Sequence, residues 1–215
     1  MKMKRDKRGF TFIELLVVIA VFSLMIVIII GIFVTLSSTQ RRLSYTLQAE
    51  TDIRYVLEVM GQEIRGNALD YDYYANIYSG AGQTFPEPIN ILALRGRQQE
   101  QICFGLDSSN EVIRMTLDEG CETGWQTITT SKVRVKELNF FISPHEDPYN
   151  TRLCTSPDDC FYGTCLDNGD NDYCQYTDEH PKVTIVLTAE NKLARETERE
   201  EVFLQTTISS RQYFR

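Results

Sequence analysis

Hydrophobic residues follow three patterns along the chain, and each pattern predicts a different kind of element. The first is an apolar run from Phe10 to Leu36, interrupted only by a few small polar residues and by one charge, Glu14. This run exceeds the ~20 residues that a helix needs to cross a bilayer. Because it contains no proline, we expect one membrane-spanning helix over residues 10–36.

The second pattern follows Leu36, where apolar residues recur at intervals of roughly three or four. The recurring residues are Leu43, Leu47, Ile53, Leu57, Met60 and Ile64. Charged residues such as Glu58 mostly fall between them, which is typical of a helix that packs one face against a core. We therefore predict one helix from about Phe10 to about Arg65, ending near Gly66-Asn67, with residues 37–66 as its amphipathic half.

The third pattern consists of short segments with the composition of β-strands, separated by turns. They are residues 89–95, 100–106, 111–117, 125–130, 132–143, 182–190 and 200–214. Short strands joined by short turns predict an antiparallel sheet, in which the segment at 132–143 continues the meander. The predicted fold is α+β, with the long N-terminal helix packed on the sheet of a β-rich domain over residues 67–215.

The segment between the helix and the first strand, residues 67–88, is rich in tyrosine, asparagine, glycine and proline. Its aromatic residues are Tyr71, Tyr73, Tyr74 and Tyr78. This composition predicts a loop that packs on the sheet, in preference to a ligand site.

A long polar insertion, residues 144–181, lies between the predicted strand at 132–143 and the last predicted antiparallel pair, 182–190 and 200–214, and it contains four of the six cysteines. The cysteines are Cys103, Cys121, Cys154, Cys160, Cys165 and Cys174. An even number of cysteines beyond a membrane segment predicts up to three disulfides. We expect Cys103 to pair with Cys121 across a hairpin and the other four to staple the insertion. Zinc bound by those four and His180 is the alternative, although no C-x2-C spacing occurs.

The insertion is also rich in oxygen ligands, and Asp167, Asn168, Asp170 and Asp172 form a candidate calcium site. The alternative is a solvated acidic turn, because the run does not match an EF-hand loop. No other cofactor is expected. Neither histidine, His145 or His180, belongs to a recognisable catalytic motif, so the chain is not predicted to be an enzyme.

The charge distribution predicts the topology of the chain in the membrane. The leader, residues 1–9, has five basic residues and one acid, which predicts a cytoplasmic N-terminus and an extracytoplasmic domain. The formal net charge is −8 overall, so the remainder of the chain carries −12. Such an acidic ectodomain argues against a general affinity for nucleic acid.

The junction KRGFTFIELLVVIAV closely resembles the prepilin signal of type IV pilins and type II secretion pseudopilins. In that family a short basic leader precedes a glycine, a phenylalanine and a glutamate at the fifth position of the apolar helix. Here these residues are Gly9, Phe10 and Glu14. The ending VFLQTTISSRQYFR resembles the last strand of the minor pseudopilin J and of PilW-like minor pilins, whereas the cysteine-rich insertion departs from that group.

The resemblance implies a set of partners and processing steps. A prepilin peptidase cuts between Gly9 and Phe10, the new Phe10 amine is N-methylated, and an inner-membrane assembly platform receives the subunit. Other pilins or pseudopilins then contact its N-terminal helix, where Glu14 pairs with the Phe10 amine of a neighbouring subunit. Pairing offsets much of the cost of desolvating both charges.

Together these features predict a minor pilin or pseudopilin that primes or caps a type IV pilus or a type II secretion pseudopilus. Before assembly it is a single-pass protein of the cytoplasmic membrane. The alternatives are a filament-tip adhesin that binds through the insertion, a competence subunit in DNA uptake, and a plain signal-anchored protein.

Overall fold

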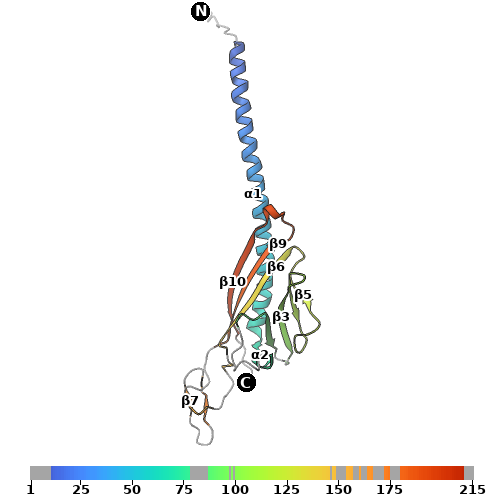
Figure 1. The fold of residues 1–215 in the computed structure, drawn as a ribbon, viewed down its shortest axis with the longest axis vertical. Helices are drawn as coiled ribbons and strands as arrows, with labels where there is room; N and C mark the ends of the chain where they lie inside the picture. The colour runs from blue at the N-terminus through green and yellow to red at the C-terminus, as the bar shows by residue number, and fades with distance from the viewer. Residues whose placement is uncertain are drawn as a thin grey trace, which may run out of the picture. The chain divides into compact units, whose positions relative to one another are not determined.

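The fold is described from a computed structural model of the chain. It describes residues 11–77, 87–96, 98, 100–145, 147–148, 154–156, 160, 164–166, 172–174 and 180–210. The chain forms two compact units, Met1–Ser44 and Tyr45–Arg215. Figure 1 shows the elements of both units along the chain.

The predicted long helix is confirmed as α1, Phe12–Gly66. Its buried stripe in the second unit consists of Ala49, Ile53, Val56, Met60 and Ile64. These residues recur every three or four positions, so they lie on one face of the helix.

The predicted stripe was wrong at its N-terminal end. Leu43 and Leu47 are 57% and 51% exposed. The stripe that leads to Ala49 continues toward Tyr45 and Thr46, which lie four and three positions earlier and are half-buried. Leu47 therefore belongs to another face of the helix.

The first sheet contains five antiparallel strands in sequence order. They are β1 (Ala68–Leu69), β2 (Ile91–Arg95), β3 (Gln101–Asp107), β4 (Val112–Thr116) and β5 (Gln126–Thr127). The side chain of Asp107 accepts hydrogen bonds from the backbone N–H groups of Ser109 and Asn110, which fixes the turn between β3 and β4.

The second sheet has the order β10-β9-β6 and is also antiparallel. Its strands are β6 (Val133–Ser143), β9 (Lys182–Asn191) and β10 (Glu201–Ser209), and the 3-10 helix η2 (Glu196–Glu198) lies between β9 and β10. The prediction of one continuous meander was wrong, because β6 pairs with β9 and not with β5. Figure 1 shows β10, β9 and β6 side by side.

A single hydrophobic core joins α1 to both sheets. Ile53 and Met60 of α1 belong to the same core cluster as Phe104 of the first sheet and Phe140 and Ile185 of the second, and none of the five side chains is exposed. Ile89, two residues before β2, and Phe140 of β6 donate backbone hydrogen bonds of 3.0 Å to each other. This pair of bonds connects the segment that leads into the first sheet with the second sheet. The α+β prediction is confirmed.

Residues 71–77 form a short helix, α2 (Tyr71–Ile77), where a loop was predicted. The side chain of Asp70 accepts a hydrogen bond from the backbone N–H of Tyr73 at 3.2 Å and caps this helix. Tyr74 is buried, and its hydroxyl accepts a 2.8 Å hydrogen bond from the backbone N–H of Ala93. The aromatic cluster does pack on the sheet, but from a helical turn; Tyr78 lies outside the described residues.

The insertion begins and ends at adjacent positions of the second sheet. Ser143, the last residue of β6, is the direct register partner of Lys182, the first residue of β9. Within the insertion, β7 (Cys165–Leu166) pairs with β8 (Tyr173–Cys174). The insertion is therefore an enlarged hairpin connection between two neighbouring strands.

Candidate functional site

The first turn of α1 holds the only charge of the described apolar segment. Oε2 of Glu14 accepts hydrogen bonds from the backbone N–H and from the hydroxyl of Thr11, both at 3.1 Å. In return, the backbone N–H of Glu14 donates to the Thr11 hydroxyl at 3.4 Å. This reciprocal arrangement is a capping box, and the sequence T-x-x-E ahead of an apolar run is its signature.

The capping box provides hydrogen bonds to only one of the two oxygens of the Glu14 carboxylate. Among the described residues, no donor reaches Oε1, whereas Oε2 accepts two hydrogen bonds. The position in the first turn is favourable for an anion, because the helix dipole is positive there. A carboxylate with one open oxygen at the start of an apolar helix is suited to bind a cationic group brought by another molecule.

Among the described residues, none covers the apolar part of α1. From Phe12 to Leu36 every residue of the segment is exposed, and Phe12 and Phe33 reach 77% and 70%. By length and composition the helix is able to cross a membrane. A contiguous apolar surface of this size needs lipid or other protein around it. Gly9 and Phe10, the predicted processing site, lie outside the described residues.

Residues 4–36 match the prokaryotic N-terminal methylation motif. The match supports a type IV pilin-like family, whose members are structural subunits and not enzymes. Together with the apolar helix, it supports a membrane-anchored protein with a single span. No curated protein and no solved structure matches the chain.

Three disulfides join all six cysteines. Cys103–Cys121 joins β3 to the connection between β4 and β5, and Cys154–Cys165 and Cys160–Cys174 lie within the insertion. The two bonds in the insertion meet at the β7–β8 pair, where Cys165 is the register partner of Cys174. Cysteines from both ends of the insertion are thereby held at one place.

The root of the insertion is fastened on both sides. The Tyr71 hydroxyl donates a 2.9 Å hydrogen bond to the carbonyl of Pro144, where the insertion begins. The backbone N–H of Ser210 donates a 2.8 Å bond to the carbonyl of Pro181, where the insertion ends. The Ser210 hydroxyl in turn donates to the carbonyl of Asn67, just after α1. The insertion therefore leaves the domain at the end where α1 finishes.

The candidate metal ligands of the insertion are only partly described. Asp167, Asn168 and Asp170 lie outside the described residues; the backbone carbonyl of Asp172 accepts a hydrogen bond from the N–H of Cys154 at 3.0 Å. The sulfur atoms of Cys154, Cys160 and Cys174 lie within 4.8 Å of one another. Because all three are in disulfides, they offer no thiolate to zinc unless they are reduced. Calcium and zinc binding stay predictions.

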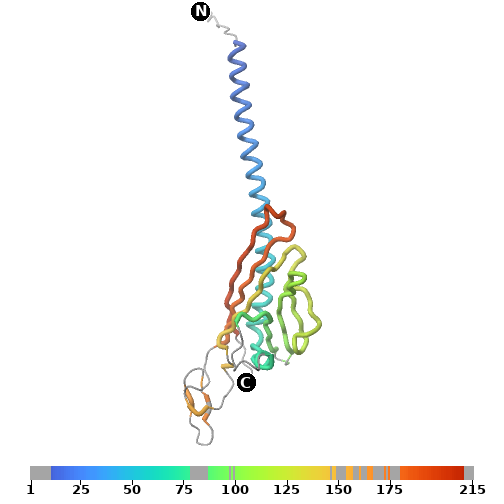
Figure 2. Tube along the Cα trace, viewed as in Figure 1, coloured from blue at the N-terminus to red at the C-terminus, as the bar shows by residue number. Residues whose placement is uncertain are grey.

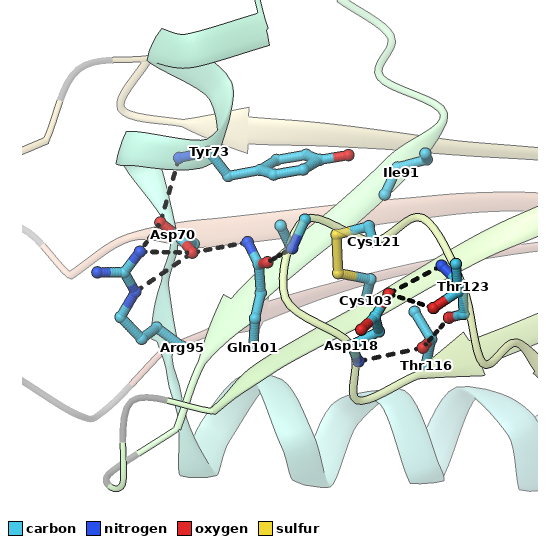
Figure 3. Close-up of a disulfide and its surroundings, with 12 residues drawn as sticks. Asp70, Tyr73, Ile91, Arg95, Gln101, Cys103, Thr116, Asp118, Cys121 and Thr123 are labelled. Carbon is cyan, nitrogen blue, oxygen red and sulfur yellow. Dashed lines mark hydrogen bonds and ion pairs between the residues drawn. A yellow bond between two sulfur atoms is a disulfide. The ribbon is translucent and has the colours of Figure 1, made fainter.

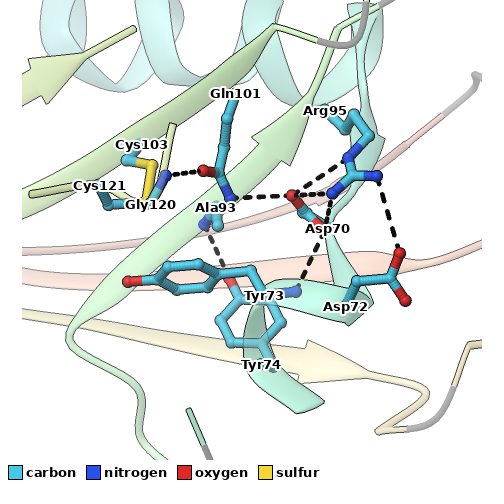
Figure 4. A network of polar contacts seen from close by, with 10 residues as sticks. All are labelled: Asp70, Asp72, Tyr73, Tyr74, Ala93, Arg95, Gln101, Cys103, Gly120 and Cys121. Atoms are coloured by element: carbon cyan, nitrogen blue, oxygen red, sulfur yellow. Dashed lines mark hydrogen bonds and ion pairs between the residues drawn. A yellow bond between two sulfur atoms is a disulfide. The ribbon is translucent and has the colours of Figure 1, made fainter. Parts of the chain in front are cut away.

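A polar network next to Cys103–Cys121 was not predicted. Asp70 is 2% exposed and accepts hydrogen bonds from Arg95 and from the side-chain amide of Gln101, the latter at 2.9 Å. The carbonyl oxygen of that amide accepts a hydrogen bond from the backbone N–H of Gly120, which precedes Cys121 (Figures 3 and 4). The network ties the segment after α1 to the disulfide-bonded turn. No local sequence signal identifies Gln101 as its centre.

The same turn contains a carboxylate with a perturbed pKa. Two hydrogen bonds from Thr123 lower the pKa of Asp118; the bond from its hydroxyl has the larger effect, and the bond from its backbone N–H has the smaller one. Figure 3 shows both contacts beside the disulfide. The turn between β4 and β5 is thus fastened by a covalent bond and by a charged hydrogen-bonded group.

A second ionic cluster joins the strands of the second sheet. Glu190 of β9 is 2% exposed and lies 3.4 Å from Arg134, 2.9 Å from Lys136 and 3.6 Å from Arg199. Hydrogen bonds to Glu201, which has the larger effect, and to Glu190 raise the pKa of Lys136. Since β6, β9 and β10 each supply a charged member, the cluster holds the sheet together.

The two histidines lie near the two ends of the insertion. Nδ1 of His145 is 3.5 Å from Oε1 of Glu87, and His180 is exposed. Of the sequence-predicted residues, the six cysteines are brought together in three pairs. Glu14 and the insertion belong to different units, and each is a candidate site by itself.

Proposed function

We propose that the protein is a minor pilin or pseudopilin whose N-terminal helix packs against the helices of other subunits in a type IV pilus or a type II secretion pseudopilus. The observation that carries this proposal is the Glu14 carboxylate in the first turn of an otherwise apolar, exposed helix segment, where the described residues supply hydrogen-bond donors to only one of its two oxygens. In the bilayer such a charge is costly. A cationic amine from a neighbouring subunit offsets that cost and fixes the axial register of the two helices.

The partners follow from this proposal. A prepilin peptidase cleaves between Gly9 and Phe10, Phe10 is N-methylated, and the inner-membrane assembly platform extracts the mature subunit from the bilayer. The C-terminal strand β10 and the residues after it supply the resemblance to the minor pseudopilin J and PilW-like kind. We therefore propose a position that primes or caps the filament.

The proposal is tested by separating processing from assembly. A Gly9→Val variant is expected to accumulate as the uncleaved precursor, whereas Glu14→Ala is expected to be cleaved but not incorporated. Immunoblots of membranes and of sheared filaments measure the two steps. Glu50→Ala serves as a matched control, because this glutamate forms a helix-surface pair with Arg54 in the second unit. Wild-type incorporation of Glu14→Ala would show that the pairing proposal is wrong.

A second candidate function is favoured by the construction of the insertion. It is stapled by two disulfides, rooted at Pro144 and Pro181, and placed at the end of the domain where α1 finishes. Such a cross-linked module, at the tip of a filament, is suited to bind a surface.

Replacing residues 144–181 by Asn-Gly discriminates between the two functions. Because Ser143 and Lys182 are register partners, a two-residue turn can join them without moving the strands. Retained assembly with loss of surface adhesion favours the tip adhesin. Loss of assembly, with the domain still folded, favours a structural role for the insertion.

A further inference from the structure

We propose that the four cysteines of the insertion reach their pairing through a thiol–disulfide isomerase, which rearranges a first-formed set of bonds between consecutive cysteines. The partner is defined by its chemistry: it is a protein with a reactive thiolate that exchanges disulfides without net oxidation or reduction. This inference goes beyond the proposed function, because it concerns the unassembled subunit and does not depend on filament formation.

The pairing within the insertion is interleaved. In chain order the first of its cysteines is bonded to the third and the second to the fourth, as Cys154–Cys165 and Cys160–Cys174. The bonded partners are 11 and 14 positions apart, whereas Cys160 follows Cys154 by only six. Because the entropy cost of closing a loop rises with its length, closure of the first bond in the unfolded chain favours Cys154–Cys160 over Cys154–Cys165 by roughly 2.5-fold.

The folded backbone is compatible with the consecutive pairing as well as with the interleaved one. The sulfur atoms of Cys154 and Cys160 lie within 4.8 Å of each other, although they belong to different bonds. Cys165 and Cys174 are direct register partners of β7 and β8, which Figure 2 shows as adjacent orange segments. Directly opposed residues of antiparallel strands have Cβ atoms about 4.5–5.5 Å apart, close to the separation that a disulfide requires. Folding of the backbone therefore does not by itself exclude the consecutive bonds.

The positions of the sulfur atoms provide a route from one pairing to the other. The Sγ atoms of Cys154, Cys160 and Cys174 all lie within 4.8 Å of one another, so a thiolate on one of them is close to the other two. Cys165 and Cys174 are half-buried, whereas Cys154 and Cys160 are 6% and 7% exposed. Since exchange requires access to the attacked sulfur, an external thiolate enters at the Cys165–Cys174 bond of the consecutive form.

The rearrangement takes three exchange steps. The isomerase thiolate attacks Sγ of Cys165, which forms a mixed disulfide with the isomerase and releases the Cys174 thiolate. That thiolate attacks Sγ of Cys160, so that Cys160–Cys174 forms and the Cys154 thiolate is released. The Cys154 thiolate then attacks Sγ of Cys165 in the mixed disulfide, which forms Cys154–Cys165 and returns the isomerase thiolate. Each step breaks one S–S bond and makes another, so no oxidant or reductant is consumed.

The experiment follows disulfide formation in the full chain. The reduced, denatured chain is diluted into detergent micelles with diamide and without added thiol, the remaining thiols are alkylated, and the bonded pairs are identified by proteolysis and mass spectrometry. Asp158, Phe161 and Asp167 separate the four cysteines in the sequence, so cleavage at aspartate and at aromatic residues distinguishes every pairing. The internal control is Cys103–Cys121, because its partners are consecutive cysteines.

Without thiol, we expect Cys154–Cys160 to exceed Cys154–Cys165 by about 2.5-fold. A catalytic amount of a purified, reduced thiol–disulfide isomerase should then convert the mixture to the interleaved pairing, whereas Cys103–Cys121 should be in place at both stages. Interleaved bonds alone before the isomerase is added, or consecutive bonds that persist after it, would overturn the proposal. Equally fast conversion by reduced glutathione at the same thiol concentration would show that no protein partner is required.

Cysteine variants test the geometry separately from the folding reaction. Cys165→Ser with Cys174→Ser leaves Cys154 and Cys160, which are expected to form a disulfide in the folded domain. The matched control is Cys154→Ser with Cys165→Ser, because it keeps the native Cys160–Cys174 bond. Circular dichroism checks that both variants fold, and alkylation counts their free thiols; two free thiols in the first variant and none in the control would contradict the proposed intermediate. Because no second subunit takes part, these results are independent of whether the protein forms a filament.

Discussion

Gly61 of α1 lies directly against Ile208 of β10. A Cβ atom at position 61 would be 3.1 Å from Cδ1 of Ile208 and 3.3 Å from Nη2 of Arg65. The absence of a side chain at this position lets the edge strand of the second sheet pack closely on the helix. Since both neighbouring atoms are at the ends of flexible side chains, a methyl group can be accommodated, whereas a larger side chain cannot.

We therefore expect Gly61→Ala to change the free energy of unfolding by no more than about 1 kcal/mol, because the helix propensity gained by alanine offsets the tight contact. Gly61→Leu should destabilise the domain by roughly 1–3 kcal/mol through overpacking. Thermal unfolding of the full chain in detergent measures both changes. Gln62→Leu is the control, because Gln62 is exposed next to Gly61. Equal stability of Gly61→Leu and Gln62→Leu would contradict the close packing.

Removal of the Cys103–Cys121 disulfide should destabilise the domain. The bond joins residues 18 positions apart, and cross-links of this size stabilise by about 3 kcal/mol through the entropy of the unfolded chain. A double Cys103→Ala, Cys121→Ala variant should therefore unfold at a clearly lower temperature. The control is Cys154→Ala with Cys165→Ala, which opens a bond within the insertion and should leave the main transition in place. A larger loss in the control would show that the insertion is part of the cooperative unit.

The stability of the domain at acid pH should depend on Thr123. The hydroxyl of Thr123 is the largest cause of the lowered pKa of Asp118. A carboxylate whose folded pKa lies below its unfolded value of ~3.9 stabilises the fold above that value, and this contribution is lost as the pH falls through the folded pKa.

Thr123→Ala should therefore raise the pKa of Asp118 toward its ordinary value and make the loss of stability below pH ~4 less steep. Carboxyl NMR titration and denaturant unfolding between acid and neutral pH measure the two effects. Asp107 is the internal control, because the hydrogen bond from the Asn110 side chain is the main cause that lowers its pKa. A shift of Asp107 as large as that of Asp118 would indicate a general change in the sheet.

Neutralising Glu190 should weaken the second sheet. Glu190→Gln keeps the shape but removes the charge that three cationic side chains share. The contacts from Arg134 and Lys136 are hydrogen bonds, and hydrogen bonds to charged groups contribute about 1.5–3 kcal/mol each. The exposed Glu137 on β6 provides the control as Glu137→Gln. If both variants unfold at the same denaturant concentration, the cluster does not hold the strands together.

The dependence of stability on pH in the alkaline range provides a separate test of the same cluster. Contacts with Glu201 and Glu190 raise the pKa of Lys136, so its contribution to stability is present below its unfolded pKa of ~10.4 and is lost as the pH rises through the folded pKa. In Lys136→Met the stability should therefore depend less on pH in the alkaline range. An unchanged alkaline slope in denaturant unfolding would contradict this role.

The sequence by itself determined the elements whose signal is local. The apolar run, its T-x-x-E start and the three-to-four-residue spacing after it predict α1, because helical hydrogen bonds join residues four apart along the chain. Strand segments were predicted for the same reason, since alternation and turn residues are readable within a few positions. The pilin-like signal at Glu14 is likewise contained in a short stretch.

Only the tertiary structure decided which segments meet. The division into two sheets depends on β6 pairing with β9, across the whole insertion, and Gln101 joins Asp70 to Gly120 through bonds that no local pattern encodes. Leu47 is exposed although its spacing fits a stripe, because the face that is buried depends on where the sheets contact the helix. Long-range pairing costs chain entropy and is selected by the packing of the whole core, so single segments of sequence do not specify it.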